Sequence, residues 1–177
     1  MPVEVELRSF LTEEKYNQLK DFFDTNANFK GEDTQETHYF DCEQDLRIQK
    51  NNKGSKIWMK KGKIHDEDRE EIEIPTEPED FENLQKLFKH LNYGVEIKWF
   101  RKRLTYEWDK ITVCLDHTKG YGHILELEIL TEEKNKQQAL ATLKDKFELL
   151  KIPVTPRETF DKRFKYYKEN WKKLTKS

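Results

Sequence analysis

The chain of 177 residues carries 33 basic and 35 acidic residues, so its formal net charge is only −2. This near balance argues against a general polycation that binds nucleic acid through charge alone. Aromatic residues make up 12% of the chain, which argues against disorder, and the length favours a single domain over residues 1–177. No apolar run approaches the ~20 residues of a membrane span, and no signal-peptide apolar segment follows Met1. We therefore expect a cytoplasmic protein with no membrane partner.

Apolar residues at two different spacings divide the chain into predicted helices and strands. Spacing of three or four residues indicates helices, and strict alternation indicates strands. In chain order we predict a strand at residues 3–10, a helix at 12–26, strands at 36–41, 45–50, 55–62 and 68–74, a helix at 79–92, strands at 95–107, 110–116 and 122–130, and helices at 131–152 and 157–174. The helix at 131–152 is expected to begin at a Thr131 cap. Groups of strands separated by single helices predict an α+β fold with a largely antiparallel sheet.

The first predicted strand, VEVELRSF, places its charges on one face. Alternation puts Glu4, Glu6 and Arg8 on one side and the apolar residues on the other. Other predicted strands repeat this arrangement and carry charged residues at every second position: Arg69, Glu71 and Glu73; Arg101 and Arg103; Glu126 and Glu128. Helices need apolar strand faces to pack on, so we expect the charged faces to line the lumen of a closed barrel. Charges in such a lumen must be paired, hydrated or bound to ions.

A lumen with both signs of charge suits a phosphate chain and its metal ion. Carboxylate oxygens hold hard divalent cations such as Mg²⁺ or Mn²⁺, and Arg and Lys side chains bind phosphate oxygens. His117 and His123 do not have the spacing of a zinc site. Trp58 and Trp99 could stack on single-stranded RNA, but we expect them to pack beneath helices, so nucleic acid is not an expected partner.

Several motifs together resemble one known family. The string EVELR resembles the ExExK signature of the CYTH superfamily, the triphosphate tunnel metalloenzymes. Later strings follow in the order of that family's motifs: HYFD with LRIQ, IWMKKG, REEIE, FRKRLTY and LDHTKGYGHILELE. The resemblance covers roughly residues 3 to 128 and is followed by a C-terminal helix in the expected place. Two positions depart from the family pattern: Arg8 stands where a Lys is usual, and Gln49 replaces a second Arg.

This resemblance implies an eight-stranded antiparallel β-barrel, or tunnel, with flanking helices and a C-terminal helix. It assigns the metal ligands for Mg²⁺ or Mn²⁺ to Glu4, Glu6, Glu71, and one or both of Glu126 and Glu128. It assigns the phosphate contacts to Arg8, Arg47, Lys61, Arg69, Arg101 and Arg103. The residues that it places at the chemistry are Glu4, Glu6, Arg8, Lys61 and Asp116, of which Asp116 completes the acidic patch or positions water.

The resemblance also implies an enzyme that acts on a triphosphate-containing small molecule. We favour metal-dependent hydrolysis of tripolyphosphate, or of a nucleoside or thiamine triphosphate, because hydrolysis needs no pocket for a base or ribose. A class IV adenylyl cyclase that makes cyclic AMP and pyrophosphate would use the same tunnel, and so would a non-catalytic protein that binds polyphosphate or nucleotide. We expect a monomer or a homodimer.

Overall fold

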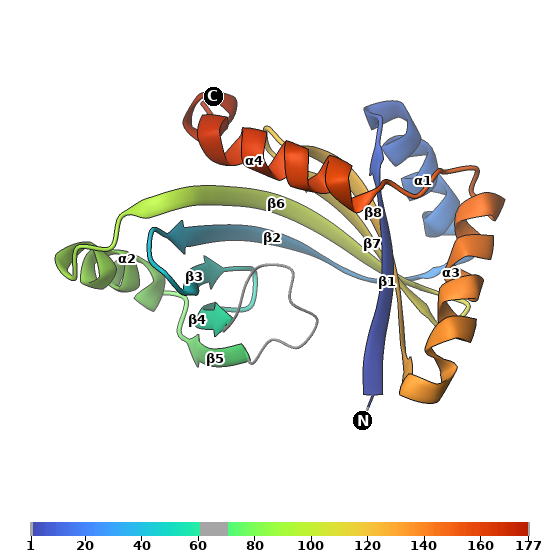
Figure 1. Ribbon diagram of the computed structural model, residues 1–177, viewed down its shortest axis with the longest axis horizontal. Coiled ribbons are helices and arrows are strands. Elements are labelled where there is room, and N and C mark those ends of the chain that lie inside the picture. The colour runs from blue at the N-terminus through green and yellow to red at the C-terminus, as the bar shows by residue number, and fades with distance from the viewer. Residues whose placement is uncertain (1, 61–70, 177) are drawn as a thin grey trace. The chain divides into compact units, whose positions relative to one another are not determined.

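The computed structural model describes residues 2–60 and 71–176 (Figure 1). Its strands are β1 (Pro2–Leu11), β2 (Asn28–Phe40), β3 (Asp45–Lys50), β4 (Ser55–Lys60), β5 (Glu71–Thr76), β6 (Val95–Trp108), β7 (Ile111–Thr118) and β8 (Gly122–Glu132). Its helices are α1 (Glu13–Asn26), α2 (Asp80–His90), α3 (Lys136–Leu149) and α4 (Arg157–Leu174), with a short 3-10 helix, η1 (Glu133–Asn135), before α3. No helix in these two ranges is long and apolar enough to cross a membrane.

Two element boundaries differ from the sequence predictions because strand pairing overrides the local signal. β2 begins at Asn28, although residues 28–35 are mostly polar. Ion pairs accompany this extension, with Lys30 lying 3.2 Å from Glu107 and Glu32 lying 3.1 Å from Lys102. The predicted helix start at Thr131 is wrong, because residues 122–132 continue as β8 along β1.

The strands form one sheet in the order β1-β8-β7-β6-β2-β3-β4-β5. The predicted eight-stranded antiparallel sheet with flanking helices and a C-terminal helix is therefore confirmed. The hydrogen-bonded order ends at β1 and at β5, so in the described residues the sheet is open where we expected closure into a barrel. Pro75 lacks a backbone N–H, which suits β5 to an edge position.

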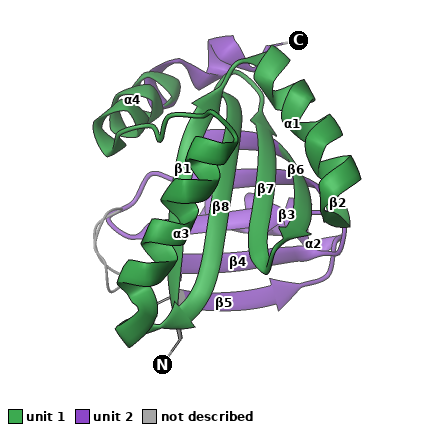
Figure 2. Ribbon diagram, turned by 90° about the vertical axis from the view of Figure 1, so that its right-hand side faces the viewer, with its two compact units in different colours: residues 1–32, 102–167 green, residues 33–101, 168–177 purple. Residues whose placement is uncertain are grey.

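The chain divides into two compact units (Figure 2). Unit 1 comprises residues 1–32 and 102–167, and unit 2 comprises residues 33–101 and 168–177. In unit 1, α1 and α3 cover the same face of β1, β8 and β7. Fully buried side chains from each layer meet there, including Phe23 of α1, Leu127 of β8 and Leu143 of α3. This burial is the main stabilising contribution to unit 1.

Unit 2 repeats the arrangement on a smaller scale. Phe81, Leu84 and Phe88 of α2 pack on Phe40 and Ile48 of the strands. The aromatic stripe predicted at residues 79–92 is therefore a core face, as the spacing indicated.

Replacing Phe23 by Ala tests the core of unit 1. The Phe23 ring is fully buried and contacts the rings of Tyr106 and Trp108. We expect Phe23→Ala to lower the free energy of unfolding by about 3–5 kcal/mol, measured by urea denaturation. Leu130→Ala is the control, because Leu130 is 67% exposed and its loss should change stability by less than about 0.5 kcal/mol. Equal losses in the two variants would contradict this description of the core.

Candidate functional site

The charged residues at the start of the chain share one face of unit 1 with those of β8. β1 and β8 pair antiparallel, with Glu6 opposite Glu128 and Arg8 opposite Glu126. Glu4 lies on the same face because it precedes Glu6 by two residues of the strand. The other face carries the apolar residues beneath α1 and α3. The prediction that helices cover the apolar strand face and leave the charges on the opposite side is confirmed for α1 and α3, whereas Phe160 of α4 contacts Arg8 on the charged side.

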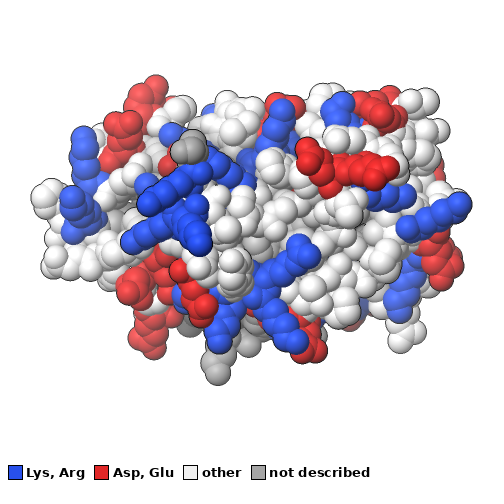
Figure 3. All heavy atoms as spheres, turned by 90° about the horizontal axis from the view of Figure 1, so that it is seen from above, with Lys and Arg blue, Asp and Glu red and all other residues white. Residues whose placement is uncertain are grey.

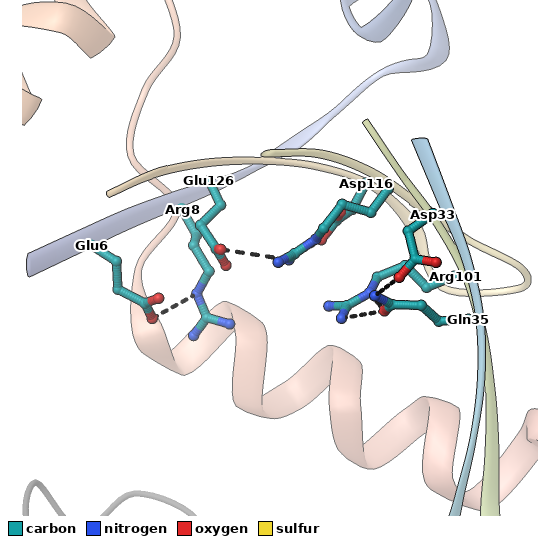
Figure 4. Close-up of polar contacts among 8 residues, drawn as sticks. Glu6, Arg8, Asp33, Gln35, Arg101, Asp116 and Glu126 are labelled. Carbon is teal, nitrogen blue, oxygen red and sulfur yellow. Dashed lines mark hydrogen bonds and ion pairs between the residues drawn. The ribbon is translucent and has the colours of Figure 1, made fainter. Parts of the chain in front are cut away.

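A buried ion pair extends this charged face onto β7 and β6. Cys114 lies opposite Glu126, so Asp116, two residues further along β7, has the same orientation. Arg103 donates from Nε and Nη2 to the two carboxylate oxygens of Asp116, each at 2.7 Å. Its Nη2 also lies 3.5 Å from Oε1 of Glu126 (Figure 4). The Asp116 side chain is only 5% exposed, so Arg103 neutralises a charge that water cannot reach.

Partial burial, together with the charges of neighbouring carboxylates, raises the pKa of Glu128. Partial burial disfavours its charged form, and the charges of Glu4, Glu126 and Glu6 raise the pKa further. Like charges directly opposite each other in a sheet destabilise it, as Glu6 and Glu128 do here. The acidic end of this face therefore carries unfavourable energy that a cation would relieve.

Burial also alters the ionisation of the groups around Arg103. Burial raises the pKa of Glu126, and the attraction of Arg103 offsets part of this effect. Burial opposes the charge of Arg103, but hydrogen bonding and attraction to Asp116 outweigh it and raise the pKa of the guanidinium. Burial raises the pKa of the Cys114 thiol to about 12, so this thiol stays protonated near neutral pH and is not a candidate nucleophile.

The carboxylates of unit 1 fit a hard divalent cation by their chemistry. Among residues 2–60 and 71–176, no three His, Cys, Asp or Glu side chains already converge as a ready-made metal site. Glu6 instead lies 3.6 Å from Nε of Arg8, and Glu126 lies near Arg103. The charges of Glu4 and Glu6 nevertheless oppose the ionisation of Glu128, and Mg²⁺ or Mn²⁺ prefers carboxylate oxygens such as these. Small side-chain rotations, with Arg8 released to an anionic ligand, would free these oxygens.

Two predicted phosphate contacts lie on one face of the unit 2 sheet. Arg47 donates from Nε and Nη2 to the carboxylate of Asp45, both at 2.6 Å. Arg101 donates to Oε1 of Gln35, which is four residues from Tyr39 on β2 and so shares its face. Tyr39 lies opposite Arg47, so both arginines occupy this face.

Trp58 is a residue whose position differs from the sequence prediction. We expected it beneath a helix, but it lies opposite Arg47, on the charged face of unit 2. The guanidinium carbon of Arg47 lies 4.3 Å from the centre of the Tyr39 ring and 5.3 Å from the centre of a Trp58 ring. The alternation of Lys56, Trp58 and Lys60 in the sequence is the signal that places Trp58 on this face.

Three other predicted site residues have less structural context. Glu71 begins β5 opposite Lys60, while Lys61 and Arg69 lie outside the described residues. On the face shown in Figure 3, Lys and Arg side chains lie among Asp and Glu side chains.

Comparison with known proteins identifies the same family as the motifs. The family model for the CYTH domain matches residues 2–164. A structure from Pyrococcus horikoshii OT3 is similar with a TM-score of 0.66 and 25% identity, covering 88% of this chain and 96% of that one. No curated protein matches the sequence.

Two further solved structures share the fold at lower identity. One is an adenylyl cyclase candidate from Hippeastrum, described as having a dominant triphosphatase activity, with a TM-score of 0.64 and 17% identity over 90% of this chain and 94% of that one. The other is an adenylate cyclase candidate from Vibrio parahaemolyticus, with a TM-score of 0.60 and 17% identity over 88% of this chain and 95% of that one.

Removing the charge of Glu128 should stabilise the metal-free protein. Because its pKa is raised, ionisation costs stability, and this cost is absent below the ordinary carboxyl pKa and grows as pH rises through the raised value. We expect Glu128→Gln to raise the free energy of unfolding at pH 7 by a few tenths to about 1 kcal/mol, with a smaller gain at pH 4. Glu107→Gln is the control, because Glu107 has a cationic partner in Lys30 and should give no gain. A loss of stability in Glu128→Gln at pH 7 would contradict the repulsion.

Breaking the buried Arg103–Asp116 pair from one side should strongly destabilise the fold. We expect Asp116→Ala to lower the free energy of unfolding by about 3 kcal/mol, because Arg103 would be left buried without its partner. Thermal or urea denaturation would measure this loss. Glu158→Ala is the control, since the Glu158–Lys162 pair is 76% exposed at both side chains and should contribute less than about 0.5 kcal/mol. An Asp116→Ala loss as small as that of the control would show that the pair is not buried in solution.

Proposed function

Because the chain belongs to the CYTH domain family, we propose that it hydrolyses a triphosphate in a metal-dependent reaction. The observation that carries this proposal is the charged face of unit 1. There, the carboxylates of Glu6 and Glu128 lie on opposite residues of β1 and β8. Arg8 lies 3.6 Å from Glu6, and Arg103 lies 3.5 Å from Glu126. The phosphate groups of such a substrate would pair with the arginines of this face, and its metal ion would pair with the carboxylates.

We assign Glu4, Glu6 and Glu128 as the residues that hold Mg²⁺ or Mn²⁺. Their oxygens are the donors that such ions prefer, and partial burial together with the charges of Glu4 and Glu6 raises the pKa of Glu128. Such an ion, when bound, offsets the charge that develops on phosphate oxygens during transfer.

The basic residues orient the phosphate chain. Arg8 is 45% exposed at its side chain and presents planar N–H donors that match phosphate oxygens. Arg103 is held in one orientation by Asp116, so we assign Asp116 as a positioning residue rather than as an acid or base. Following the resemblance, we also assign Arg47, Lys61, Arg69 and Arg101 to phosphate binding. Holding the phosphate chain of the substrate in line with a water molecule lowers the entropic part of the activation barrier to hydrolysis.

Glu126 is the carboxylate best suited to orient the attacking water. Burial raises its pKa, which makes its carboxylate a stronger base than an ordinary one. Its position opposite Arg8 places it beside a proposed phosphate contact.

Phosphate release from tripolyphosphate, ATP and thiamine triphosphate tests the proposal. We expect release with Mg²⁺ or Mn²⁺, no release with a chelator, and a loss of at least about 100-fold in kcat/KM for Glu6→Gln. Glu14→Gln is the control, because Glu14 lies on α1 and is exposed. Cyclic AMP with pyrophosphate from ATP would identify a cyclase instead. Binding without turnover would indicate a polyphosphate-binding protein, and neither binding nor turnover would contradict the proposal.

A further inference from the structure

We propose that Phe160 of α4 is a positioning residue for Arg8, and through Arg8 for the phosphate chain of the substrate. This inference rests on the proposed function, because it needs Arg8 to bind phosphate. Both residues belong to unit 1, which contains residues 1–32 and 102–167.

Arg8 and Phe160 begin a stack of four groups, in which two aromatic rings lie between two guanidinium groups. The guanidinium carbon of Arg8 lies 4.8 Å from the centre of the Phe160 ring. The Phe160 ring in turn stacks on Phe10, with centres 4.5 Å apart and planes 28° apart. The guanidinium carbon of Arg163 lies 4.1 Å from the centre of the Phe10 ring and closes the stack. Cations are attracted to the faces of aromatic rings, so the two arginine contacts at the ends of this stack are favourable.

The segment before α4 fixes this stack to β1 through the backbone. The N–H of Thr155 donates to the carbonyl oxygen of Arg8 at 3.2 Å, and the N–H of Phe10 donates to Oγ1 of Thr155 at 2.9 Å. The hydroxyl of Ser9, which is 1% exposed, donates to the carbonyl oxygen of Pro153 at 2.6 Å. Bonds from three successive residues of β1 therefore set where α4 begins and hold Phe160 beside Arg8.

Stacking on one ring face suits Arg8 to phosphate binding. Arg8 contacts the Phe160 ring on one side and is 45% exposed at its side chain, which leaves N–H donors for phosphate oxygens. An exposed Arg loses side-chain freedom when it binds a ligand, and a platform that restricts it beforehand reduces that loss.

Equilibrium binding of tripolyphosphate in the presence of a chelator tests this role without turnover. We expect Phe160→Leu to weaken binding about two- to five-fold, which is the loss of one exposed cation–π contact expressed as a ratio of Kd values. Phe160→Tyr should bind like the wild type, because it keeps the aromatic face. Tyr166→Leu is the control, because Tyr166 lies on the same helix and is 59% exposed. In an Arg8→Gln background, Phe160→Leu should have no further effect.

Equal binding by the wild type and Phe160→Leu would overturn this inference and leave the proposed function in place. So would an unchanged effect of Phe160→Leu in the Arg8→Gln background, because Phe160 would then act independently of Arg8. If the wild type bound no tripolyphosphate and turned over no triphosphate, the proposed function would fail. A double-mutant cycle of Arg8→Gln and Phe160→Leu, with Tm as the readout, would then test whether the two side chains interact. Non-additive Tm shifts support the contact, and additive shifts overturn it.

Discussion

Burial of the apolar face of β1 and β8 beneath α1 and α3 determines where the charges of unit 1 lie. Successive strand residues point to opposite faces, so placing Val5 and Leu127 in the core places Glu6 and Glu128 on the other side. A shift of register by one residue would exchange the two sets, which the core forbids. The charged face is therefore a consequence of the hydrophobic core, and its charges must be neutralised by neighbouring groups on the same face.

The charges on that face are neutralised at one end and not at the other. Arg103 and Asp116 form a fork-to-carboxylate pair with short bonds and little exposure, which is complete within the protein. The carboxylates at the other end are not balanced in this way, and partial burial together with neighbouring carboxylate charges raises the pKa of Glu128. A fold that tolerates such repulsion has an acidic surface ready for a cation, and Arg8 beside it suits an anionic ligand.

The helices, the strands and the charged face of unit 1 follow from residue spacing, because alternation fixes which side chains share a face. The partners of the charges do not follow from spacing. Nothing in the sequence shows that Asp116 receives both donors of Arg103, because residues 13 apart meet only through the pairing of strands. The contact of Phe160 with Arg8 is equally hidden, since Phe160 follows Arg8 by more than 150 residues and is held beside it by bonds that Pro153 and Thr155 make with β1. The place of Trp58 was available from alternation, but its aromatic character favoured a core prediction instead.

The central claim is that the carboxylate face of β1 and β8 binds a divalent cation together with a phosphate chain. A crystal structure of the protein with Mn²⁺ and tripolyphosphate, with the ion located by its anomalous scattering, tests it most directly. The account predicts the anomalous peak within coordination distance of Glu6 and Glu128, with phosphate oxygens on the side of Arg8. An ion bound elsewhere, or a phosphate chain that avoids this face, would contradict it.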